Sequence, residues 1–129
     1  MFENKKIRIL VTDDDAELLK TLVKILSRRG YQTFPFESPV KALEFLKGEK
    51  VDLILSDLKM PEVDGIQFLD RAKSIRPKTP FILITGFATV DTAVSAIKNG
   101  AFDYLRKPFE VKKIYEVVDR ALQTGGGAS

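Results

Sequence analysis

Short runs of apolar residues alternate along the chain with longer segments in which apolar residues recur at helical spacing. The runs predict strands with both faces covered, and the longer segments predict helices with one buried face. The expected strands are 7–12, 31–36, 51–56, 81–85 and 102–106. The expected helices are 16–29, 39–47, 66–75, 90–98 and 111–123. Such regular alternation is typical of a parallel sheet between two layers of helices, which predicts a three-layer α/β fold.

Residues at the predicted helix ends agree with these boundaries. Ser38 followed by Pro39 has the form of an N-cap with proline at the first helical position. Gly30 and Gly100 stand where a glycine commonly ends a helix. The run 31–36 alternates only weakly between apolar and polar residues, so we expect this strand near an edge of the sheet.

The composition is that of one water-soluble globular domain. The 129 residues are 44% hydrophobic and 30% charged, enough apolar material for a core. The net charge of +3 is small and the basic residues are scattered, so direct nucleic-acid binding is not expected. No apolar stretch is long enough for a membrane span or a signal peptide. We expect a cytoplasmic domain over 1–124 and a flexible tail or linker remnant at 125–129.

Polar residues follow four of the predicted strands, at the ends that meet along one edge of a parallel sheet. They are Asp13, Asp14 and Asp15 after the first strand, Asp57 after the third, Thr85 ending the fourth and Lys107 after the fifth. Taken alone, Asp15 can cap a helix, Thr85 can be a satisfied hydroxyl and Lys107 can lie in a solvated turn. Two carboxylates about 4 Å apart, however, repel by roughly 4 kcal/mol at an effective dielectric constant of about 20. The cluster therefore predicts a hard cation with oxygen ligands, Mg²⁺ or Mn²⁺.

The residue types that remain limit the chemistry of this cluster. The sequence has no Cys, no His and no glycine-rich phosphate loop, which excludes disulfides, a Ser-His-Asp triad and most zinc sites. Attack by a carboxylate on phosphorus, giving an acyl phosphate, is the reaction that the cluster can support. Lys107 can reach a phosphate or Asp57, and Thr85 can donate its hydroxyl to a phosphoryl oxygen, which makes Thr85 a candidate sensor.

Four segments, ILVTDDDAELL, LILSDLKMPEVDG, FILITGFA and GAFDYLRKPFE, resemble in order and spacing the receiver domain of two-component response regulators. The segment 86–109 is most similar to receivers of the nitrogen-regulator class, which precede an ATPase and a DNA-binding module. The resemblance implies a flavodoxin-like, doubly wound (βα)5 sheet with strand order 2-1-3-4-5. It also implies a cis peptide bond at Lys107-Pro108. One departure from the usual pattern is Gly86, where alanine is common.

The resemblance implies a role for each candidate residue. Asp57 would accept a phosphoryl group from a sensor histidine kinase or phosphotransfer protein, and Lys107 would pair with that group. Thr85 and Tyr104 would form a switch that alters the fourth helix, fifth strand and fifth helix, a surface for an output partner or a homodimer. The implied ligands of the cation are Asp13, Asp14, Asp57 and the main-chain carbonyl of Lys59. Such a domain catalyses only its own phosphorylation and dephosphorylation and is not a classical enzyme.

Three alternatives differ from this hypothesis in a recognisable way. An aspartyl-phosphate phosphatase would need a second acid two residues after the nucleophile, where this chain has Lys59. A flavodoxin-like electron carrier would need a phosphate-binding loop after its first strand, where this chain has three aspartates. A receiver-like interaction module that is not phosphorylated would lack chemistry at Asp57 altogether.

Overall fold

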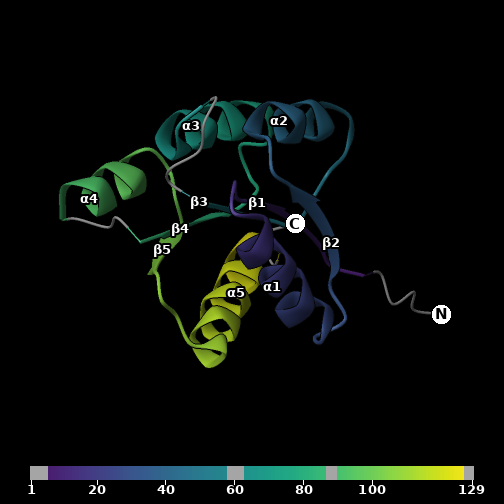
Figure 1. The fold of residues 1–129 in the computed structure, drawn as a ribbon. Coiled ribbons are helices and arrows are strands. Elements are labelled where there is room, and N and C mark those ends of the chain that lie inside the picture. Colours follow the sequence, from purple (N-terminus) through teal and green to yellow (C-terminus); the bar gives the residue numbers. More distant parts are fainter. Residues whose placement is uncertain (1–5, 58–62, 87–89, 127–129) are drawn as a thin grey trace.

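Strands and helices alternate through the computed structural model, which describes residues 6–57, 63–86 and 90–126 (Figure 1). The strands are β1 (Arg8–Thr12), β2 (Gln32–Phe36), β3 (Leu53–Asp57), β4 (Phe81–Thr85) and β5 (Asp103–Arg106). The helices are α1 (Ala16–Ser27), α2 (Pro39–Gly48), α3 (Gly65–Ile75), α4 (Val90–Lys98) and α5 (Val111–Gly126). Each predicted element is present, with ends displaced by a few residues.

All neighbouring strands pair in parallel, in the order β2-β1-β3-β4-β5. Helices α2 and α3 cover one face of the sheet, and α1 and α5 cover the other (Figure 1). The predicted three-layer architecture and strand order are therefore confirmed. Every residue of β3 and β4 is buried, as their continuous apolar character predicts for strands in the middle of such a sheet.

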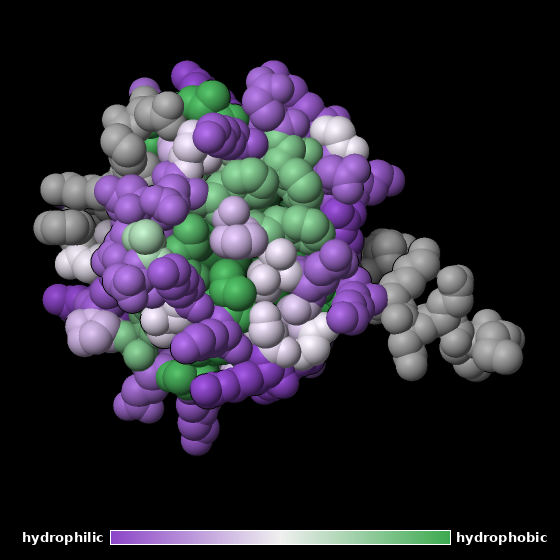
Figure 2. Space-filling view, turned by 45° about the vertical axis from the view of Figure 1, so that its right-hand side comes forward, coloured by the Kyte–Doolittle hydropathy of each residue, from purple (hydrophilic) through white to green (hydrophobic). Residues whose placement is uncertain are grey.

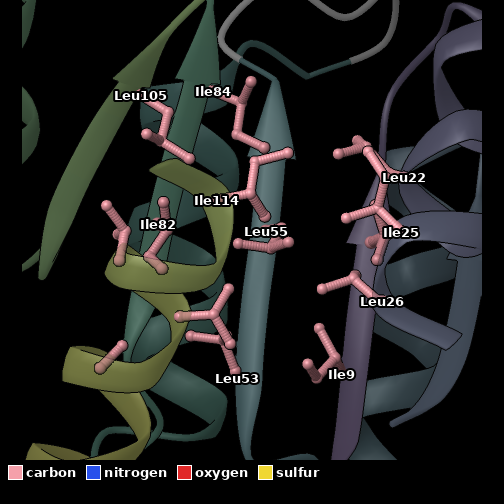
Figure 3. Close-up of a cluster of buried hydrophobic side chains, with 14 of the residues drawn as sticks. Ile9, Leu22, Ile25, Leu26, Leu53, Leu55, Ile82, Ile84, Leu105 and Ile114 are labelled. Atoms are coloured by element: carbon pink, nitrogen blue, oxygen red, sulfur yellow. The ribbon is translucent and has the colours of Figure 1, made fainter. Parts of the chain in front are cut away.

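Two clusters of buried side chains lie on opposite faces of the sheet. One joins α1 and α5 to β1, β3, β4 and β5, through residues that include Leu22, Leu55 and Ile114 (Figure 3). The other joins α2, α3 and α4 to the sheet and includes the fully buried rings of Phe68 and Phe81. Together these two layers fix the strands on which the polar cluster is built.

Helix starts follow the capping chemistry of their first residues. The Asp15 carboxylate accepts from the backbone N–H groups of Glu17 and Leu18, and the Ser38 hydroxyl accepts from that of Lys41. Asp64, which the apolar pattern does not mark, forms a capping box with Gln67 at the start of α3. Helix α5 runs to Gly126 and so passes the predicted end at 123. The division between a domain at 1–124 and a tail at 125–129 stays a prediction.

The edge strand β2 has a proline on its outer side. In β2, the N–H of Gln32 donates to the carbonyl of Ile7, and the carbonyl of Phe36 accepts from the N–H of Asp13. Peptide groups alternate along a strand, so Pro35 stands with its nitrogen directed away from β1. A proline there costs the sheet no hydrogen bond and leaves the outer edge without one donor.

Three aromatic rings cover the face of the sheet beside the edge strand β2. Phe45 of α2 lies with its ring centroid 4.9 Å from that of Phe34 and 5.3 Å from that of Phe36. All three rings are partly buried against the α2–α3 side of the core. Figure 2, which brings the β2 side of the molecule forward, shows hydrophobic residues gathered there inside a border of hydrophilic ones.

Candidate functional site

The site lies at the carboxyl ends of β1 and β3, which are neighbours in the sheet. Thr12 of β1 is paired with Ser56 of β3, so the residues that follow them, Asp13 and Asp57, come side by side. Asp13 is 1% exposed and Asp57 6%, whereas Asp14 is exposed. One carboxylate oxygen from each of these three residues lies within 4.8 Å of the others. Periodicity alone could not place them together, because it does not determine strand order.

Lys107 reaches this cluster from the end of β5. Its Nζ lies 3.2 Å from Oδ2 of Asp13 and 3.4 Å from Oδ2 of Asp57. The N–H of Lys107 donates to the carbonyl of Thr85 at 2.8 Å, which fixes the start of the loop against β4. The peptide bond between Lys107 and Pro108 is cis, as predicted. One ammonium group thus bridges two buried carboxylates.

The remaining predicted residues belong to β4, β5, the start of α1 and a segment outside the described residues. Thr85 is buried at the end of β4, the strand between β3 and β5. Tyr104 is partly buried and packs against the α2–α3 side of the core. Lys59, the predicted carbonyl ligand, lies outside the described residues. Asp15 serves as the N-cap of α1, so the structural explanation holds for it.

One residue of the site was missed at the sequence level. Ser56 is fully buried, and its hydroxyl donates to the carbonyl of Asp57 at 3.0 Å. A hydroxyl inside an otherwise apolar run was the signal that could have indicated it. At Gly86, an added Cβ would lie 3.8 Å from Cβ of Lys107, which is ordinary contact, so alanine would also fit there.

Electrostatics in the cluster favour an additional cation. Burial raises the pKa of Asp13 above its ordinary value, although the backbone N–H of Asp15 and the charge of Lys107 oppose that rise. The neighbouring charge of Asp14 raises the pKa further. Three carboxylates and one ammonium leave the cluster negative overall. A hard divalent cation would fit this donor set, because it prefers carboxylate oxygens and Asp14 is open to water.

The sequence profile of the response regulator receiver domain matches residues 9–119. The chain belongs to this family. The predicted resemblance is therefore confirmed, and with it the assignment to two-component signalling. Receiver domains of this family bind Mg²⁺ at an acidic pocket, and the cluster of Asp13, Asp14 and Asp57 lies where such a pocket is expected.

Named relatives of this receiver domain include nitrogen regulators. The chain is 38% identical over 114 residues to the DNA-binding transcriptional regulator NtrC of Escherichia coli K12, covering 88% of this chain and 24% of NtrC. This similarity confirms the predicted likeness to that class. The chain spans about a quarter of the length of the curated relatives that it matches.

Solved structures repeat the fold of this receiver domain. A CheY-like receiver domain protein from Methanospirillum hungatei JF-1 superimposes with a TM-score of 0.93 at 28% identity, covering 97% of this chain and 100% of that one. The beryllofluoride-activated NtrC4 receiver domain dimer gives 0.86 at 36% identity, covering 90% and 96%. Within the described ranges of this receiver, no helix has the length and apolarity needed to cross a membrane.

Proposed function

We propose that this receiver domain is a phosphorylation switch and that Asp57 is its phosphoacceptor. The observation that carries the proposal is the position of the Asp57 carboxylate, at the end of a central strand, among two more carboxylates and the ammonium of Lys107. A buried carboxylate paired with one cation can keep its charge and so remain a nucleophile.

In the proposed reaction, an Asp57 carboxylate oxygen attacks the phosphorus of a phosphohistidine on a sensor kinase or phosphotransfer protein. The new P–O bond forms as the P–N bond breaks, and the imidazole leaves with the electron pair and takes a proton. The ammonium group of Lys107, which contacts Asp57, would pair instead with the phosphoryl oxygens. Asp13 and Asp14, with Asp57, would hold Mg²⁺ or Mn²⁺, which when bound offsets the charge of the phosphoryl group.

The proposed response is a change in the surface formed by α4, β5 and α5. The Thr85 hydroxyl would donate to a phosphoryl oxygen. The side chain of Tyr104, a residue that pairs with Leu83 in the sheet, would then change its position. Both side chains are positioned by β4 and β5, which lie next to each other. A partner protein or a second copy of the chain would then bind the altered surface.

The experiment compares the intact mass of the protein before and after incubation with Mg²⁺ and acetyl phosphate. Wild type should gain one phosphoryl group, and Asp57→Asn should gain none. The matched control is Asp70→Asn, which alters an exposed carboxylate on α3 and should be phosphorylated like wild type. An unmodified wild type would indicate an interaction module without this chemistry, and a modified Asp57→Asn would contradict the choice of acceptor.

A further inference from the structure

Strand β5 is the second edge of the sheet, and its outer side has no proline. The N–H of Lys107 donates to the carbonyl of Thr85 on β4. Because peptide groups alternate, those of Tyr104 and Arg106 are directed away from β4. Pro35 removes a donor from the opposite edge, whereas β5 keeps the outward N–H of Arg106 and the outward carbonyls of Tyr104 and Arg106. The N–H of Tyr104 donates to Oδ1 of Asp103 at 2.7 Å. An edge of this kind can pair with one more strand.

A groove of about 580 Å³ runs beside this edge. Its walls come from β5, through Tyr104 and Arg106, and from the segment that follows, through Phe109, Lys112 and Lys113. In Figure 1, β5 lies at the margin of the sheet, with α4 to one side and α5 to the other. The edge therefore faces an open hollow, with the partly buried ring of Phe109 as an apolar contact inside it.

The charges around the groove are exposed and have an excess of cations. Three cations, Arg106, Lys112 and Lys113, stand against two carboxylates, Glu110 and Glu116. Within the part of the chain that the structure describes, none of the five takes part in an ion pair. These cations are available to a partner that carries negative charge.

We propose that β5 takes an extended segment of a partner protein as a sixth strand, and that this segment alternates apolar side chains with carboxylates. Its backbone would pair with the N–H of Arg106 and with the outward carbonyls of Tyr104 and Arg106, since the N–H of Tyr104 already donates to Asp103. Its apolar side chains would pack on Phe109, and its carboxylates would meet the cations of the groove. This inference deepens the proposed function, since it names the kind of partner that the α4, β5 and α5 surface binds.

Two other occupants fit the groove less well. A helix satisfies its own peptide groups and would leave the outward N–H and C=O groups of β5 to water. A second copy related by a twofold axis would bring the same patch, with the same excess of cations, against the first. An acidic strand meets both the hydrogen-bonding and the charge requirements of the edge.

The first test is a calorimetric titration of the full chain with a terminally blocked peptide of alternating valine and glutamate. A valine–lysine peptide is the charge control. Two further acidic peptides carry N-methyl groups on alternate amides. One is methylated at the odd-numbered amides and the other at the even-numbered amides, so that each blocks the donors on one side of the extended peptide. The acidic peptide should bind at least about tenfold more tightly than the lysine peptide, and one methylated set should lose at least about tenfold in affinity while the other does not. Equal binding of the two methylated peptides would overturn the strand inference.

The second test uses the protein side of the same contact. Arg106→Gln removes the charge, and Arg106→Pro also removes the outward N–H, as Pro35 does at the opposite edge. Arg106→Gln should weaken the acidic peptide, and Arg106→Pro should weaken it further. Lys24→Gln on α1 is the matched control and should bind like wild type. If Arg106→Pro does not fold, the methylated peptides still decide the question.

The two proposals can fail separately. Peptide binding should persist in Asp57→Asn, because Asp57 lies at the end of β3 and takes no part in the β5 edge. A protein that binds the peptide but is not phosphorylated would overturn the proposed function alone. A protein that is phosphorylated, does not bind the peptide and forms a dimer that Arg106→Glu disrupts would overturn the strand inference in favour of a second copy.

Discussion

Among single residues, Lys73 of α3 has an unusual environment for a charged side chain. Its Nζ donates to the carbonyl of Thr79 at 3.1 Å, and it forms no ion pair with any residue in the described ranges. Burial lowers the pKa of its ammonium below the ordinary value of 10.5. The folded state therefore gives up this proton at a lower pH than the unfolded chain does.

The exchange Lys73→Met tests this linkage. Between the lowered pKa of the folded state and 10.5, the unfolded chain binds more protons, so the free energy of unfolding of wild type rises with pH across that window. The variant lacks this rise. Its stability relative to wild type should be greatest at neutral pH and should fall as the pH approaches 10.5, as measured by urea unfolding at a series of pH values. A difference that does not vary with pH would contradict the prediction, and Lys20→Met, at an exposed position on α1, is the control.

The glycine after α4 is required by its backbone conformation. Gly100 has φ +102°, and a Cβ there would lie 3.4 Å from Cε of Lys73. We expect Gly100→Ala to lower the free energy of unfolding by about 1–2 kcal/mol, because the left-handed region is strained for a residue with a Cβ. Gly48 has open space and no positive φ, so Gly48→Ala should be neutral or raise stability by about 0.5 kcal/mol. Chemical denaturation of both variants checks the pair, and equal losses would refute this explanation.

At the scale of elements, periodicity predicted the helices and strands because burial of one helix face, or of both strand faces, leaves a regular mark in the sequence. It did not predict the cap at Asp64, since one polar residue in a polar loop carries no period. It also missed the end of α5, because residues 124–126 have no apolar repeat. At the site, the rule that parallel strands share their carboxyl ends brought Asp13, Asp57 and Lys107 together, whereas Ser56 was hidden inside its strand.

The edge strand β2 offers a test at this scale. Pro35→Thr should restore an outward donor and leave the ladder to β1 intact, so the free energy of unfolding should change by no more than about 1 kcal/mol. The open edge beside the aromatic rings of Phe34 and Phe36 should then favour self-association, visible as a concentration-dependent sedimentation coefficient. Pro35→Lys restores the same N–H but adds a charge, so it should self-associate less than Pro35→Thr. Identical behaviour of the two variants would contradict a role for the edge.

For the molecule as a whole, the acidic cluster should couple stability to divalent cations. A cation that binds only the folded state raises the free energy of unfolding by about 2.7 kcal/mol at a concentration one hundred times its dissociation constant. We expect Mg²⁺ to raise the melting temperature of wild type. Asp14→Asn should respond less, because it removes one of the three clustered carboxylates.

The same variant should differ in the opposite direction without the cation. Asp14→Asn removes a like charge next to Asp13, so in a chelator it should be at least as stable as wild type. Thermal unfolding with and without Mg²⁺ measures both effects, with Asp70→Asn as the control of equal charge change. The same gain from Mg²⁺ in wild type and Asp14→Asn would argue against a site at these carboxylates.

Pro35 also has a consequence for how many molecules one sheet can join. In the terms of polymer chemistry, a domain with two open edges is a bifunctional unit and can grow into chains of any length. A domain with one edge closed by proline is monofunctional, so growth ends after a single addition. If β5 takes a guest strand, as we propose, and Pro35 keeps the β2 edge from pairing, the native sheet would accept one guest strand and would not extend into a filament.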